Sequence, residues 1–125
     1  MKASPVRVAT GEWLNSRFDF CELMHRDTLD ALQADVARVG GLTEARRVTM
    51  AARDKGLAVV PHCGKSAIGI AASAHLVVVS PTCIYMEFVP RELADSSLRK
   101  DLCSVELSVV GGRIPLPTAP DFVSR

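Results

Sequence analysis

Four polar side chains recur along the sequence at nearly even spacing, each after a short run of β-prone residues. They are Glu12, Asp35, His62 and Glu87, separated by 23 (35−12), 27 (62−35) and 25 (87−62) residues. One strand-and-helix unit occupies about this length. In a parallel barrel the carboxyl ends of all strands lie on one face, so the four side chains should converge there. Carboxylates and imidazoles are groups that proteins use for acid–base catalysis and for metal binding, and the spacing therefore predicts a site.

Each of these residues also has a simpler interpretation when it is taken alone. Asp35 could only cap the loop that follows it, His62 could be a satisfied core histidine, and Glu12 could be a solvated carboxylate that binds magnesium weakly. Lys65 could reach a substrate carboxylate, although a solvated loop lysine fits its position equally well. Cys63 suggests a thiol nucleophile, but it follows His62 directly, and neighbours along a strand point to opposite faces.

The elements that must position these residues form a repeated strand-and-helix pattern. β-Prone runs at 5–10, 29–33 and 57–60 are each followed by a helical pattern. Thr43 is the expected N-cap of the second helix, and Ser66 is the expected N-cap of a third, which runs to about Val79. The expected units are about 5–27, 28–56 and 57–82, followed by a strand at 84–88 and a tail at 90–125 that holds a strand from Val105 to Val110, a turn and an extended segment.

The predicted fold class is α/β, as a partial TIM-type (β/α) barrel with about four parallel strands and a C-terminal extended tail. Eight strands in about 250 residues make a complete barrel, so this chain corresponds to about half of one. A half barrel has two open edges, which predicts a homo-oligomer or association through those edges. A flavodoxin-like open sheet shares the local pattern, but a glycine-rich phosphate loop after the first strand is missing.

Composition limits the classes of protein that the chain can belong to. Its 125 residues are 48% apolar, which is enough for one domain with a core. The 15 basic and 14 acidic side chains nearly cancel and form no basic run, which argues against nucleic acid as a partner. The longest apolar stretch, 68–79, is shorter than the roughly 20 residues that cross a bilayer, and the N-terminus lacks an export signal. We expect a soluble, cytoplasmic protein with reduced cysteines.

Three segments resemble the C-terminal barrel half of the enolase superfamily, in its mandelate racemase and muconate lactonizing enzyme branch. They are Ala9–Glu12, Gln33–Glu44 and Val60–His62, and the resemblance runs from about residue 5 to residue 120. The most specific part is the block QADVARVGGLTE, which is similar to the family's Asp-x-x-(Lys/Arg)-x-Gly-Gly signature. Ala34 departs from the pattern because it replaces the usual proline, and Gly64 stands where an aromatic residue is common.

The resemblance implies a role for each of the four strand-end residues. Glu12 matches the third of three carboxylates that hold Mg²⁺, and the first two would lie before Met1. Asp35 matches the carboxylate that orients a catalytic imidazole. His62 matches that imidazole, a general acid or base at the carbon next to the substrate carboxylate. Glu87 matches the acid that hydrogen-bonds the developing enediolate.

The resemblance also implies a reaction and a small-molecule partner. Removal of the proton alpha to a carboxylate, followed by loss of a β-hydroxyl, would convert a sugar acid to a 2-keto-3-deoxy acid, and the context of His62 favours such a dehydratase. Return of the proton would instead give a racemase or epimerase. An alternative of another class is a catalytically inactive truncated fragment, or a small self-associating α/β module.

Overall fold

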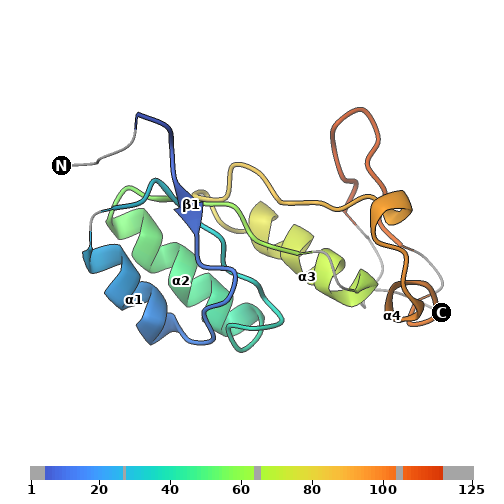
Figure 1. Ribbon diagram of the computed structural model, residues 1–125, viewed down its shortest axis with the longest axis horizontal. Helices are drawn as coiled ribbons and strands as arrows, with labels where there is room; N and C mark the ends of the chain where they lie inside the picture. Colours follow the sequence, from blue (N-terminus) through green and yellow to red (C-terminus); the bar gives the residue numbers. More distant parts are fainter. Residues whose placement is uncertain (1–4, 27, 64–65, 104–105, 117–125) are drawn as a thin grey trace.

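The chain alternates short strands with longer helices, as the computed structural model shows for residues 5–26, 28–63, 66–103 and 106–116 (Figure 1). The helices lie side by side along the molecule, and the C-terminal segments gather at the end remote from α1. The elements in chain order are β1 (Ala9–Thr10), α1 (Arg17–His25), β2 (Ala31–Leu32), α2 (Leu42–Asp54), β3 (Ala58–Val59), α3 (Ala67–Val78), the 3₁₀ helix η1 (Arg91–Leu93) and α4 (Ser97–Lys100).

The three strands form a parallel sheet in the order β1-β2-β3. Ala31 of β2 pairs with Ala9 on one side and with Ala58 on the other. A flavodoxin-like sheet would place its first strand between the second and third. The consecutive order, with α1, α2 and α3 packed next to one another, is instead that of a section of a parallel (β/α) barrel, as the sequence predicts.

The hydrophobic core lies between the sheet and the three long helices. Phe20 of α1, Val48 of α2 and Leu76 of α3 are fully buried, and they pack in one cluster with Leu32 and Val59 of the sheet. These side chains come from the apolar faces of the helices and from strand residues that point outward from the barrel axis.

Of the two helix caps expected from the sequence, one is observed and one is not. Ser66 caps α3 by accepting a hydrogen bond from the backbone of Gly69, as predicted, and Ser16, which was not predicted, caps α1 in a reciprocal capping box with Asp19. The prediction that Thr43 caps α2 is wrong. That helix begins two residues earlier than this cap would place it, after Gly41, whose φ of +93° is accessible to glycine, and no side chain caps it.

An ion pair joins α1 to α2. Arg17 donates from Nη1 to both carboxylate oxygens of Glu44, at 2.8 and 2.9 Å. Desolvation acts to raise the pKa of the Glu44 carboxyl, but the hydrogen bonds and charges of Arg17 and Arg47 outweigh it and hold that pKa below its ordinary value. Glu44 thus contributes to helix packing rather than to the strand-end site.

The prediction of a fourth strand at 84–88 is wrong, because this segment does not form a regular strand. The chain still runs parallel to β3: Val59 forms a bridge with Cys83, and Glu87 donates its backbone N–H to the carbonyl of Pro61 at 3.1 Å. Ile84 and Tyr85 between these points are 55% and 71% exposed. Without a strand on its outer side, this segment keeps only a few ladder contacts, but these still bring Glu87 to the strand ends.

The tail agrees with the sequence prediction in part. It contains η1 and α4, which were not predicted, whereas the predicted turn at Gly111-Gly112 is present and is closed by a bridge between Val110 and Arg113. The buried Arg99 donates to Glu106, which folds this region onto itself. Val105 and residues 117–125 lie outside the described residues, and 106–109 form no strand. Among the helices that the structure describes, none has the length and apolar content needed to span a bilayer.

Candidate active site

The carboxyl ends of the strands bring three of the four predicted site residues into direct contact. Glu12 follows β1, Asp35 follows β2 and His62 follows β3. The His62 ring lies between the two acids, with Nδ1 2.9 Å from Asp35 Oδ2 and Nε2 3.5 Å from Glu12 Oε2. The even spacing of these residues in the sequence thus corresponds to a shared position at one end of the sheet.

Asp35 divides its two carboxylate oxygens between two tasks. Oδ1 accepts a hydrogen bond from the backbone N–H of Ala37 at 2.8 Å, which fixes the turn after β2. Oδ2 is the atom that contacts His62. The two interpretations of Asp35 that the sequence allows, a loop cap and a partner of His62, are therefore both observed, and the residue is almost fully buried.

His62 is held so that its two ring nitrogens have different functions. An ionised carboxylate only accepts hydrogen bonds, so the nitrogen facing Asp35, Nδ1, carries the proton. Nε2 is then the nitrogen that can exchange a proton. Its 3.5 Å distance from Glu12 is too long for a good hydrogen bond. The imidazole side chain is 17% exposed, so it is supported by protein and still reachable.

The side chain of Glu87 contacts Gln33, a residue that was not among those predicted from the sequence. Gln33 Nε2 donates to Glu87 Oε2 at 3.2 Å, across 54 residues of sequence. The signal that would have found Gln33 is its place two residues before Asp35, because residues i and i+2 point to the same face of a strand.

Two contacts across the site join alternate strand positions, whereas the Asp35–His62 contact joins adjacent strands. Side chains from alternate strands share a layer in such barrels. Glu12 and His62 follow β1 and β3, whereas Gln33 and Glu87 come from β2 and from the segment after β3. The strand-end side chains therefore interdigitate as they would in a barrel interior.

Cys63 does not take part as a nucleophile. It is buried, and burial raises the pKa of its thiol to about 12. The thiol donates instead to the backbone carbonyl of Glu87, with Sγ 3.0 Å from the oxygen. Discounting this residue as a nucleophile agrees with the geometry.

The described residues do not by themselves form a metal site. Glu12 offers the oxygen ligands that Mg²⁺ prefers, but such sites generally combine carboxylates with further oxygen ligands. Within the described part of the chain no three His, Cys, Asp or Glu side chains are grouped so that they could hold a metal ion. Lys65, the predicted substrate contact, lies outside the described residues.

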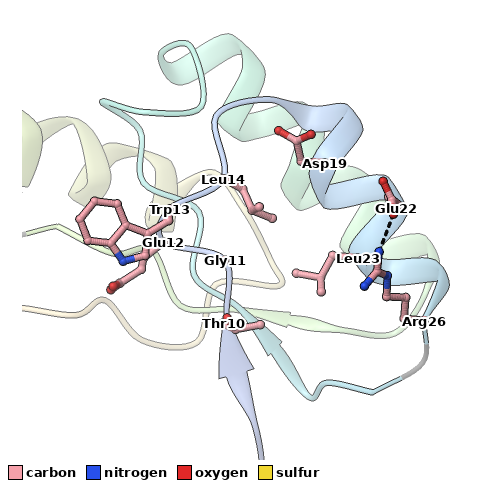
Figure 2. Close-up of a pocket in the computed structure, with 9 residues that line it drawn as sticks. All are labelled: Thr10, Gly11, Glu12, Trp13, Leu14, Asp19, Glu22, Leu23 and Arg26. Atoms are coloured by element: carbon pink, nitrogen blue, oxygen red, sulfur yellow. Dashed lines mark hydrogen bonds and ion pairs between the residues drawn. The ribbon is translucent and has the colours of Figure 1, made fainter.

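A cavity of about 300 Å³ lies beside β1 and α1, next to this group rather than within it (Figure 2). Of the four strand-end residues only Glu12 lines it, together with Leu23 of α1 and Arg26, which follows that helix. In Figure 2 the side chains of Glu12 and Trp13 lie on the side of the loop remote from Leu23 and Arg26. The cavity thus marks the open side of β1, where the sheet has no further strand among the described residues.

A family comparison agrees with this arrangement. The family model described as enolase C-terminal domain-like matches residues 1–120. The chain belongs to this family. The parallel strands with polar residues at their carboxyl ends are therefore a section of an enolase-superfamily barrel, as the resemblance implies.

Two sequence relatives within the enolase superfamily are D-galactonate dehydratases. The protein from Cronobacter sakazakii is 30% identical over 82 residues, which cover 66% of this chain and 22% of the relative. The protein from Ralstonia pickettii is 36% identical over 73 residues, covering 58% of this chain and 19% of the relative. The match thus spans about a fifth of the length of these relatives.

Solved structures show the same enolase-family fold. A candidate mandelate racemase from Bordetella bronchiseptica is 35% identical with a TM-score of 0.76, over 92% of this chain and 30% of that one. The 3,6-anhydro-D-galactonate cycloisomerase from Zobellia galactanivorans is 25% identical with a TM-score of 0.82, over 96% of this chain and 33% of that one. The similarity covers nearly all of this chain and about a third of each enzyme.

Proposed function

We propose that this chain supplies the acid–base part of an active site that dehydrates a sugar acid to a 2-keto-3-deoxy acid, once the other strands of the barrel are present. The observation that carries the proposal is the Asp35–His62 hydrogen bond at the carboxyl ends of adjacent parallel strands. Glu12 on the far side of the ring and Glu87 nearby give this pair the surroundings that such chemistry requires.

In this proposal His62 removes the proton alpha to the substrate carboxylate. Asp35 holds Nδ1–H, so Nε2 receives the proton, and the carboxylate stabilises the imidazolium that forms. Imidazole is a weak base for such a carbon acid, and the developing enediolate must be stabilised by groups positioned in advance. Glu87, in its neutral form, donates a hydrogen bond to that developing charge.

Glu12 is assigned as one ligand of a Mg²⁺ ion whose remaining ligands come from outside the described residues. A divalent cation supplies charge neutralisation at the substrate carboxylate. The chain's own residues carry the proton transfer, and the metal depends on the rest of the barrel.

The dehydratase assignment rests on the relatives. Both matching proteins named above are D-galactonate dehydratases. After the alpha C–H bond breaks, the electron pair of the enediolate expels the β-hydroxyl, which leaves with a proton as water. The resulting enol takes up a proton at the β carbon and gives the keto acid. A sugar acid is therefore the proposed small-molecule partner.

Two alternatives have observations in their favour. A racemase or epimerase, in which a proton returns to the alpha carbon, is supported by the 35% identity to the candidate mandelate racemase. A catalytically silent, self-associating module is favoured by exposed apolar residues near the edge of the sheet, since Val6, which precedes the edge strand β1, is 71% exposed.

A chimera distinguishes these functions. The chain is joined to the amino-terminal part of the Cronobacter sakazakii D-galactonate dehydratase and assayed with Mg²⁺ on a panel of sugar acids in D₂O. We expect a 2-keto-3-deoxy product that disappears in His62→Asn and persists in the matched control His25→Asn, which lies on the outer helix α1. Deuterium at the alpha carbon without keto acid supports the racemase. A folded chimera without either reaction contradicts both enzymatic assignments.

A further inference from the structure

We propose that Gln33 is a positioning residue that holds the Glu87 carboxyl in the orientation needed to donate a proton, an inference that rests on the proposed function of Glu87. Gln33 Nε2 donates to Glu87 Oε2 at 3.2 Å. The two residues are far apart in sequence and come from alternate strand positions. Their contact therefore depends on the curvature of the barrel section rather than on local chain geometry.

The backbone of Gln33 is firmly placed. Its N–H donates to the carbonyl of Thr10 at 2.9 Å, which ties the end of β2 to the end of β1. The preceding residue, Leu32, accepts from the N–H of Val60 at 2.8 Å, which ties it to β3. The amide of Gln33 thus extends from the middle strand of the sheet, on the same face as Asp35.

Glu87 lacks the support that a regular strand would provide. Its segment is not a β-strand, and the main chain at residue 87 is held by two contacts instead. The N–H donates to Pro61 O, and the carbonyl accepts from the Cys63 thiol at 3.0 Å. Since burial keeps this thiol protonated, the donor persists through the physiological pH range. These contacts fix the backbone of Glu87, and the Gln33 contact fixes its carboxyl.

The chemistry of the two groups determines where the proton of Glu87 resides. The amide nitrogen of glutamine only donates hydrogen bonds. Oε2 of Glu87 therefore acts as the acceptor, and when the carboxyl is neutral its proton lies on Oε1. Gln33 thus selects the oxygen that donates to the substrate and directs that O–H away from itself. Without Gln33 the carboxyl is free to rotate and to exchange its two oxygens.

The contact can be tested in the chain itself by NMR, independently of activity. The sequence contains one glutamine and one asparagine, so side-chain amide signals in a ¹⁵N spectrum come only from Gln33 and Asn15. In Glu87→Met, which removes the acceptor and keeps side-chain length, we expect the Gln33 amide protons to shift and to exchange faster with water. Asn15, in the loop after β1, should be unchanged. Far-UV circular dichroism shows whether Glu87→Met is folded. If it is not folded, Glu87→Gln, which retains an acceptor oxygen, is measured in its place. An unchanged Gln33 signal in Glu87→Met overturns the proposal, as does a wild-type signal that already exchanges as fast as that of Asn15.

The role in positioning is tested in the chimera described above. Gln33→Met should lower kcat about 10-fold while KM stays within about twofold, because one orienting hydrogen bond is lost in the reacting complex. Asn15→Ala is the control, with both constants unchanged. A Gln33→Met chimera with normal kcat overturns the positioning role even if the NMR contact exists. A chimera inactive in every form shows instead that the proposed function fails, and the NMR result still decides whether Gln33 holds Glu87.

Discussion

Gly11, which directly precedes Glu12, should tolerate no side chain. Its φ is +120°, a conformation that L-residues rarely adopt. A Cβ built on its backbone would lie 2.7 Å from Cε1 of Phe20, a ring that is completely buried in the core. Substitution by alanine therefore meets both backbone strain and a steric clash.

The two costs of Gly11→Ala can be estimated separately. A non-glycine residue in a sparsely populated backbone region costs about 1–3 kcal/mol. Forcing an extra carbon against a packed core side chain costs about 1–3 kcal/mol more. The expected loss in the free energy of unfolding is thus about 2–6 kcal/mol, a large part of the total for a small domain.

Urea unfolding followed by far-UV circular dichroism measures this loss. Gly56→Ala is the matched control, because Gly56 has a φ of +67° and its added Cβ would meet nothing within 4 Å. This control should lose only the backbone part, about 1–2 kcal/mol. In a double-mutant cycle, Phe20→Leu should cost less in the Gly11→Ala background than in the wild type, because the smaller side chain relieves the clash. If Gly11→Ala costs no more than Gly56→Ala, the contact with Phe20 is not limiting and the reasoning is refuted.

Three further predictions concern the dyad, the buried thiols and the open edge. Asp35→Ala should reduce the free energy of unfolding by about 1–3 kcal/mol and abolish the Nδ1–H preference of the His62 ring in ¹⁵N spectra; an unchanged ring spectrum would contradict the dyad. Burial raises the thiol pKa of Cys63 to about 12 and that of Cys83 to about 11, against an unfolded value of 9.0. As the pH rises, the unfolded chain therefore loses these protons before the folded chain does. The free energy of unfolding should be unaffected by these thiols below pH 9 and should decline as the pH rises toward 11–12. Urea midpoints at pH 8 and pH 10 measure this, and a higher midpoint at pH 10 would contradict it. Val8→Lys, at a position that directly precedes the edge strand β1 and is 40% exposed, should lower self-association in sedimentation velocity relative to wild type; equal association would exclude this edge as the contact.

The placement of the candidate site could be predicted because it depends on a repeating length. Each strand-and-helix unit returns the chain to the same end of the sheet, so residues such as Asp35 and His62 can be expected together from spacing alone. Their contact is observed, while their catalytic roles remain predictions. The N-caps at Ser16 and Ser66 also depend on residues nearby in the sequence, although only the cap at Ser66 was predicted.

The features that the sequence did not predict depend on neighbours distant in the chain. Thr43 is a good N-cap by type, but the backbone enters the helix two residues earlier, after the turn at Gly40-Gly41. The segment 84–88 has strand-like composition and lacks an outer neighbour. Gln33 finds Glu87 only because alternate strands meet inside a curved sheet. In the tail, the helical turns accompany the buried pairing of Arg99 with Glu106.

The divided carboxylate of Asp35 makes the Asp35–His62 pair a unit that could be transferred to another barrel. One oxygen shapes the turn after β2 and the other aligns an imidazole 27 residues later, so the pair is aligned by two adjacent strands and the loop between them. A segment from β2 to His62 transplanted into another parallel barrel should therefore carry an aligned His–Asp pair with it, independently of any metal ligand.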